Sequence, residues 1–294
     1  MQELRRYFYF LPTALFTLSV LSTGVSAHQP VMDMAPRWKG GYGFQVRQEL
    51  RFSDALLDGD NEIDNPSGRK RRVNTTWLEG MYTFEREVRA SIKIPWVEQS
   101  RTVLRGGVPV KEESSGLGDI ILGIPLKHYE NEASYSTNIA FTPSLRLPTG
   151  RTSGDFPVGD GSWDVNLSFS KSTEAAGLYQ YYDLFYWINN EGKSGIEEGN
   201  QLGFDANIGI HPFHNNVTNT GIFLMLDVSA RYQERGQDTS GTTGGTRVSL
   251  GPVLVWYRDN IMFRAEYKSP VYEKVFDTQV SYGSEVNIGI GITF

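Results

Sequence analysis

The sequence predicts an all-β fold: a transmembrane antiparallel up-and-down β-barrel, with twelve strands expected after a cleaved signal peptide. Segments with alternating apolar and polar residues recur along the chain, and the connections between them alternate strictly between short and long. After the first thirty residues there is no run of about 20 apolar residues, the length that a membrane-spanning helix needs. Outer-membrane barrels have an even number of strands, with short turns at one end and long loops at the other.

The N-terminal segment has the features of a secretory signal. Two arginines precede an apolar stretch that Pro12 interrupts, and a run of small residues ends at Ala27. This pattern is typical of a cleaved signal peptide, and a membrane anchor is the alternative interpretation. We therefore expect residues 1–27 to be removed and residues 28–294 to form a single barrel domain in the bacterial outer membrane.

Twelve segments carry the strand pattern. In segment 38–53, alternate positions from Tyr42 to Phe52 are apolar except for Gln48. The alternation continues for about twice the five or six residues of an average strand, and a tilted strand needs about 9–11 residues to cross a bilayer. Segment 178–190 is aromatic on both faces, which leaves its orientation open. The expected strands are 38–53, 72–85, 87–98, 118–130, 134–148, 162–173, 178–190, 200–213, 219–235, 246–258, 260–269 and 282–294.

The connections set the orientation of the barrel. The short ones are expected to be periplasmic turns, and the long polar ones are expected to be outside loops. Pro125, Pro143, Pro212 and Pro252 fall inside expected strands, where each removes a ladder donor. Either some strand boundaries are wrong or these prolines mark bulges. The expected long loops are 54–71, 99–117, 149–161, 191–199, 236–245 and 269–281.

The last segment explains how the sheet would close. Apolar residues alternate from Val286 to Phe294, and in a closed barrel this strand must pair with the first. A final strand that ends in Phe294 resembles the signal that outer-membrane barrels present to their assembly machinery, which is therefore an expected partner. Phe294 is also expected in the periplasmic aromatic girdle, together with Tyr82, Phe84, Tyr129 and Tyr135.

The polar faces of the strands predict the lining of the lumen. Basic residues outnumber acidic ones on these faces although the whole chain has a net charge of −6. Rings of positive charge favour anions or solutes that carry carboxylates. The alternative is mutual neutralisation, in which same-face neighbours such as Asp227 with Arg231 and Glu266 with Lys268 fill a narrow barrel. The predicted pore-lining residues are Arg47, Glu49, Arg51, Arg89, Lys93, Arg146, Asp205, Asp227, Arg231, Arg247, Arg264 and Glu266.

No catalytic constellation stands out in the sequence. After His28 the chain has three histidines, His128, His211 and His214, and none belongs to a His–Ser–Asn arrangement of the kind found in outer-membrane phospholipase. The chain has no cysteine, which excludes disulfides, thiolate catalysis and cysteine metal sites. We therefore expect no enzyme activity, no cofactor and no nucleic-acid partner.

Two charged segments have weaker interpretations. Asp58–Asp64 gathers four carboxylates, but Ile63 and Arg69 occupy positions where a calcium-binding EF-hand needs glycine and glutamate. A solvated acidic loop is the simpler interpretation. Arg69–Arg72 reads RKRR and either pairs with lipopolysaccharide phosphates or is an ordinary solvated loop segment.

The middle of the chain resembles the family named for the MetA-pathway of phenol degradation. The resemblance rests on the order and spacing of four segments, SIKIPW (91–96), GLGDIILG (116–123), SLRLPTG (144–150) and GDGSWD (159–164). It implies an exported outer-membrane barrel linked to the catabolism of aromatic compounds, and it supplies no catalytic residues. For the glycines and Asp119 of GLGD we expect a structural role in a turn where an outside loop re-enters the wall.

These observations favour an outer-membrane channel for the passive uptake of small solutes, with aromatic or hydrophobic compounds as candidates and a mildly basic lumen. Twelve strands are intermediate between filled small barrels and open porins, so we expect a pore that is narrow or partly plugged by loops such as 99–117. Outer-membrane lipid and lipopolysaccharide are expected partners. The alternatives are a barrel-embedded lipid hydrolase and a structural barrel whose loops bind a partner.

Overall fold

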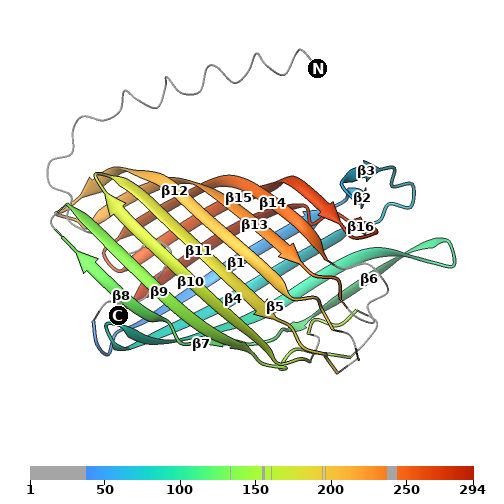
Figure 1. Cartoon of the computed structure of the whole chain (residues 1–294), viewed down its shortest axis with the longest axis horizontal. Coiled ribbons are helices and arrows are strands. Elements are labelled where there is room, and N and C mark those ends of the chain that lie inside the picture. The colour runs from blue at the N-terminus through green and yellow to red at the C-terminus, as the bar shows by residue number, and fades with distance from the viewer. Residues whose placement is uncertain are drawn as a thin grey trace, which may run out of the picture.

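The computed structural model describes residues 38–294 except 133, 154–155, 160, 194, 196 and 237–243. The described residues form a closed antiparallel β-barrel with twelve wall strands, which Figure 1 shows from the side. The predicted fold class is therefore confirmed. The predicted signal peptide lies outside the described residues. No helix in the described part of the chain is long and apolar enough to cross a membrane.

One wall strand is interrupted and the others are continuous. The interrupted strand consists of β6 (Val108–Leu117), β7 (Ile121–Gly123) and β8 (Leu126–Asn131), which follow one another between β5 and β9. The continuous strands are β1 (Tyr42–Ser53), β4 (Arg71–Glu85), β5 (Val88–Arg105), β9 (Tyr135–Arg146), β10 (Asp164–Ala175), β11 (Leu178–Ile188), β12 (Gln201–Asn215), β13 (Thr220–Gln233), β14 (Gly245–Arg258), β15 (Ile261–Val275) and β17 (Ser284–Thr293).

The barrel closes between its first and last strands. β1 pairs with β17 from Gly43 opposite Thr293 to Phe52 opposite Ser284. The backbone N–H of Phe294 donates to the carbonyl of Tyr42 at 2.8 Å, and the rings of these two residues stack with centroids 5.2 Å apart. The predicted pairing of the last strand with the first is confirmed.

The long-loop end contains more β-structure than the sequence suggests. Residues 99–117 are a β-hairpin instead of a loop, because β5 and β6 continue to a turn at Gly106 and Gly107. The hairpin extends beyond the end of the barrel instead of folding into it (Figure 1), so the expectation that this segment plugs the pore is wrong. At the same end, β2 (Leu56–Asp58), β3 (Asn61–Ile63) and β16 (Thr278–Val280) form a small separate sheet.

The four prolines that fall inside expected strands, Pro125, Pro143, Pro212 and Pro252, lie at irregularities in the strand pairing. Pro125 separates β7 from β8, and Pro143 lies on the adjoining stretch of β9, where its carbonyl accepts from Ile124 at 3.0 Å. Pro212 lies in a bulge of β12, and Pro252 lies where β14 and β15 are not paired. Proline lacks the N–H that a regular ladder would use, so these positions are wall irregularities, as one of the two interpretations predicted.

The outer face of the barrel is apolar, and the inner face is largely polar. Tyr82, Phe84, Tyr135 and Phe294 are exposed near the short-turn end, as expected for an aromatic girdle at the periplasmic side. Tyr129 does not belong to this group. The Tyr129 hydroxyl group accepts a hydrogen bond from Arg89, whose side chain is 1% exposed and faces the interior. Tyr129 therefore faces the interior as well.

Candidate functional site: the barrel interior

A central cavity of about 730 Å³ lies inside the barrel. Alternate residues of each strand face it because side chains alternate across a sheet. Of the other predicted lining residues, Arg247 lines a second cavity at the long-loop end, whereas Arg89 and Asp227 are each 1% exposed and packed among neighbours. The predicted residues that line the central cavity are Arg47, Glu49, Arg51, Lys93, Arg146, Asp205, Arg231, Arg264 and Glu266.

One ion-pair network joins the first and last strands. Arg47 donates to Glu79 at 3.1 Å and to Glu49 at 3.0 Å. Arg51 donates to Glu49 at 2.9 Å and lies 3.8 Å from Glu285. Two arginines thus face three carboxylates, and this network has no excess positive charge.

A second network lies between β13 and β15. The Lys268 ammonium is 3.1 Å from Glu266 and 3.5 Å from Asp227, and Arg264 is 3.0 Å from Glu266. The predicted neighbour pair of Glu266 with Lys268 is present. Two cations here face two carboxylates.

The partner predicted for Arg231 is wrong. Its guanidinium binds both carboxylate oxygens of Asp205 on β12 at 2.8 Å, whereas Asp227 binds Asn207 at 2.7 Å and contacts Lys268. Spacing along one strand suggested Asp227, but the cross-strand register brings Arg231 opposite Gly203 and beside Asp205. Mutual neutralisation therefore describes the middle of the barrel.

The cavity at the long-loop end, here called the outer vestibule, differs in charge. It has a volume of about 460 Å³, and its lining includes six basic residues against two acidic ones. The ring of Tyr282 lies between two guanidinium groups, with the Cζ atoms of Arg51 and Arg247 at 3.9 and 3.1 Å from its centroid. The charged residues of the outer vestibule are Arg51, Arg71, Arg146, Arg231, Arg247, Lys274, Glu198 and Glu273.

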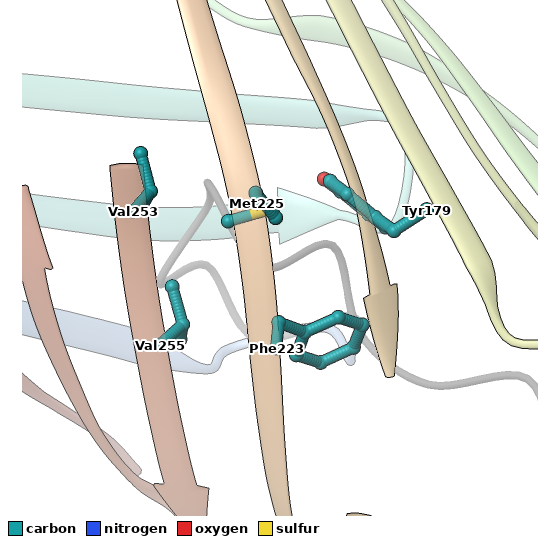
Figure 2. Close-up of a cluster of buried hydrophobic side chains, with 5 residues drawn as sticks. All are labelled: Tyr179, Phe223, Met225, Val253 and Val255. Carbon is teal, nitrogen blue, oxygen red and sulfur yellow. The ribbon is translucent and has the colours of Figure 1, made fainter. Parts of the chain in front are cut away.

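Part of the interior at the short-turn end is apolar. Figure 2 shows the inward-facing side chains Tyr179, Phe223, Met225, Val253 and Val255, here called the apolar cluster. Phe223 and Val255 are 0% exposed. This cluster does not follow from assigning the polar face of each strand to the lumen, because β13 and β14 are apolar on both faces here. The continuous apolar runs IFLML (222–226) and VLVWY (253–257) were the available signal.

The orientation of β11, which the sequence left open, is settled by the same packing. Tyr181, Asp183, Phe185 and Trp187 line interior cavities, and Tyr179 belongs to the apolar cluster. One face of this strand therefore supplies aromatic side chains along the interior from the short-turn end to the outer vestibule.

A buried polar chain borders the apolar cluster. His211 Nδ1 is 3.0 Å from Glu174 Oε1, and the Tyr257 hydroxyl is 3.2 Å from His211 Nε2 and 2.8 Å from His214 Nδ1. Both histidines lie at the short-turn end, and His128 is exposed there on the outside. Within the described ranges, no histidine lies at the outer rim, where the hydrolase alternative needs one. The described part of the chain also contains no cluster of His, Asp and Glu that could hold a metal ion.

A protein-family model with the description "Putative MetA-pathway of phenol degradation" matches residues 69–279, more than two thirds of the chain. The chain belongs to this family. Its members' shared description names a pathway and no solute. No curated protein sequence matches the chain.

Solved structures resemble this family member in fold. The COG4313 outer membrane channel from Pseudomonas putida F1 is 16% identical, with a TM-score of 0.67 over 89% of this chain and 98% of that one. The β domain of the Bordetella autotransporter BrkA (10% identical, TM-score 0.46, 87% and 100% covered) and the KdgM porin (11%, 0.43, 86% and 99%) are more distant. The chain therefore shares the barrel fold of a solved outer-membrane channel.

The family segments named above converge where β6 gives way to β7. The Gly150 N–H donates to Asp119 Oδ1 at 2.7 Å, and the Gly118 N–H donates to the Pro95 carbonyl at 2.9 Å. A Cβ atom on Gly150 would lie 2.9 Å from the Cα of Gly159. These contacts agree with the structural role that the sequence predicted for GLGD.

Asp164, the last residue of GDGSWD, is 0% exposed. It accepts hydrogen bonds from the Ser162 hydroxyl at 2.8 Å and from the Asn190 N–H at 2.9 Å, and lies 3.3 Å from Arg146. This carboxylate fixes the entry of β10 and holds Arg146 at the edge of the outer vestibule. The family segments therefore shape the outer half of the interior.

Proposed function

We propose that this barrel is a channel for the passive uptake of small solutes across the outer membrane, with a preference for organic anions. The observation that carries the proposal is the central cavity of about 730 Å³ with a charged lining. A barrel with a purely structural role would be expected to fill its interior with packed side chains.

The order of surfaces along the interior supports an amphiphilic solute. A solute from outside would first meet the basic outer vestibule and then the neutralised middle, where Phe185 and Trp187 line the wall. A carboxylate would be attracted at the first of these, and an aromatic ring would be accommodated against the aromatic side chains of the second. The description of the family refers to phenol degradation, which supports aromatic compounds as the candidates.

A non-enzymatic role fits the placement of the histidines at the short-turn end. The third possibility, a barrel whose loops bind a partner, has support only from the hairpin and the small sheet that project outward. As partners in the membrane, we propose lipopolysaccharide phosphates, which Arg72 and Lys70 would contact beside a groove at the long-loop end. We also propose that Phe294 is part of the assembly signal.

Single-channel recording of the mature chain, refolded and inserted in a planar bilayer, tests the channel proposal. We expect discrete openings and, in a salt gradient, a reversal potential that indicates anion preference. A correctly folded, heat-modifiable barrel that never conducts would contradict the proposal. A cation-selective reversal potential would keep the channel and remove the anion preference.

A further inference from the structure

Three arginines that line the outer vestibule lie opposite an arginine in the sheet register. In the sheet register, Arg71 on β4 lies opposite Arg101 on β5, and Arg231 on β13 lies opposite Arg247 on β14. Like charges directly opposite one another destabilise a sheet. Two such pairs at the same end of one barrel therefore have a cost that folding alone does not explain.

Each pair has one neutralised member and one without a carboxylate. Arg101 is 2.7 Å from Glu112, and Arg231 binds Asp205. Among the described residues, Arg71 and Arg247 form no ion pair and no side-chain hydrogen bond. Both line the outer vestibule, and their donors are available to something that enters it.

The outer vestibule has fewer acidic than basic residues, two against six. Glu273 lies opposite Arg247 in the register, but its carboxylate accepts from the Ser281 hydroxyl and from the Tyr282 N–H at 2.9 Å. Glu198 also lines the cavity, and its negative charge acts on Arg71. The vestibule therefore retains positive charge after its own carboxylates are counted.

The vestibule also has aromatic surfaces. Tyr282 is held between Arg51 and Arg247, which fixes the plane of the Arg247 guanidinium. Trp187 lines the same cavity, with the Cζ of Arg146 4.5 Å from its ring centroid. Planar guanidinium groups bind carboxylates with two parallel hydrogen bonds and stack on aromatic rings. The volume of about 460 Å³ falls within the range of small-molecule sites, roughly 300–1,000 Å³.

From these contacts we infer that the outer vestibule is a binding site for a small aromatic carboxylate, with Arg71 and Arg247 as its anion-binding residues. The inference rests on the proposed function, because it names the solute class that the channel would take up. The carboxylate binds between the two arginines, and the ring lies against the guanidinium and aromatic surfaces beside Trp187.

Isothermal titration calorimetry of the detergent-folded barrel, which requires no conduction, tests the site. We expect benzoate to bind more tightly than acetate, and benzyl alcohol, which has the ring without the charge, to bind least. Arg71→Gln and Arg247→Gln should each weaken benzoate binding at least tenfold. Benzyl alcohol binding as tightly as benzoate would overturn the carboxylate assignment, and acetate binding equally well would overturn the aromatic part.

Two variants serve as matched controls. Arg72 is the next residue on β4 and points to its opposite face, and Arg258 is exposed at the short-turn end of β14. Arg72→Gln and Arg258→Gln should bind benzoate like the unmodified protein. If they weaken binding as much as the vestibule variants do, general charge and not a site explains the affinity.

Stability separates a binding role from a structural one. Because Arg71→Gln and Arg247→Gln each relieve a like-charge pair, the midpoint of urea unfolding should rise or stay constant while benzoate binding falls. A lower midpoint in both variants would overturn the inference. A barrel that conducts without binding benzoate would support the channel proposal and contradict the binding site. A barrel that binds benzoate without conducting would support the binding site and contradict the channel proposal.

Discussion

At the scale of single residues, close backbone approach constrains this barrel as strongly as polarity does. Gly150 and Gly159 pack against each other and against Asp119, where a Cβ atom on Gly150 would lie 2.9 Å from Asp119 Oδ1. Glycine and aspartate chemistry predicts a turn and a capping role for this motif. The sequence does not identify Gly150 as the residue that Asp119 binds, because 31 residues separate them along the chain.

Gly150→Val should destabilise the barrel by about 2 kcal/mol, because its side chain would meet the Asp119 carboxylate and the Gly159 backbone at once. The measurement is urea unfolding in lipid vesicles, followed by tryptophan fluorescence. Gly289→Ala is the control, since the atoms nearest to a Cβ there belong to the side chains of Gln45 and Arg47 and lie at 3.3 Å or more. Equal losses in both variants would contradict the account of the motif.

The sequence predicted which side chains face the interior, but it did not predict the ion-pair partner of Arg231. Alternation along a strand indicated that Arg47, Glu49 and Arg231 face inward, and the cavity lining agrees. The partner of Arg231 depends on how β12 and β13 are staggered, which sequence alternation does not encode. Asp205 becomes its partner only once that register is known.

At the scale of elements, a strand in this barrel has two faces with different neighbours along its length. Near the short-turn end of β13, Phe223 faces the apolar cluster while Leu224 is 47% exposed on the outer surface. Further along, Asp227 and Arg231 occupy the inner face. The inner face of this one strand is thus apolar at one end and charged further along. The rule that polar residues of a strand face the lumen does not describe such a strand.

Phe223→Ala should raise single-channel conductance, because it removes a ring from the interior, and should lower stability by about 3 kcal/mol. The side chain of Leu224, the next residue on the same strand, faces the outer surface, so Leu224→Ala should leave conductance unchanged. Planar-bilayer recording of both variants gives the comparison. If conductance responds to Leu224→Ala and not to Phe223→Ala, the assigned faces of β13 are reversed.

The β5–β6 hairpin is an element that the sequence interpretation took for a loop, because its residues are polar and its turn contains Gly106 and Gly107. Eighteen residues of β5 exceed the roughly 9–11 that a tilted strand needs to cross a bilayer, so its far end lies outside the membrane. There, hydrogen bonds from Arg101 and Arg105 lower the pKa of the Glu112 carboxyl below its ordinary value of 4.5.

Because the folded pKa of Glu112 is lowered, its stabilisation of the hairpin is fully present above pH 4.5 and is lost as the pH falls through that lowered pKa. Amide protection factors of the hairpin, corrected for the intrinsic exchange rate, should therefore drop as the pH falls below 4.5. Glu112→Gln should abolish the pH dependence, whereas Glu113→Gln should retain it. A hairpin that remains protected down to pH 2 would contradict this account.

At the scale of the whole molecule, the alternation of short and long connections was sufficient to predict a closed barrel with twelve strands. That pattern is a property of how a chain crosses a membrane repeatedly, so it can be recognised without knowing any contact. The size and charge of the interior could not be predicted in the same way. They depend on which side chains meet across the barrel, as the outer vestibule and the apolar cluster show.

The interrupted strand between β5 and β9 also determines how this molecule would come apart. A closed sheet has no edge, so unfolding must first create one. Below the hairpin, the regular pairing of β5 covers Ser91–Lys93 with β7 and Val88 with β8, and single backbone hydrogen bonds bridge the gaps. In contrast, β13 and β14 pair along their whole length. The seam beside β7 and β8 therefore offers the lowest cost of opening. Under heat or denaturant this barrel should unzip there, and during assembly the same seam should be the last to acquire its protection.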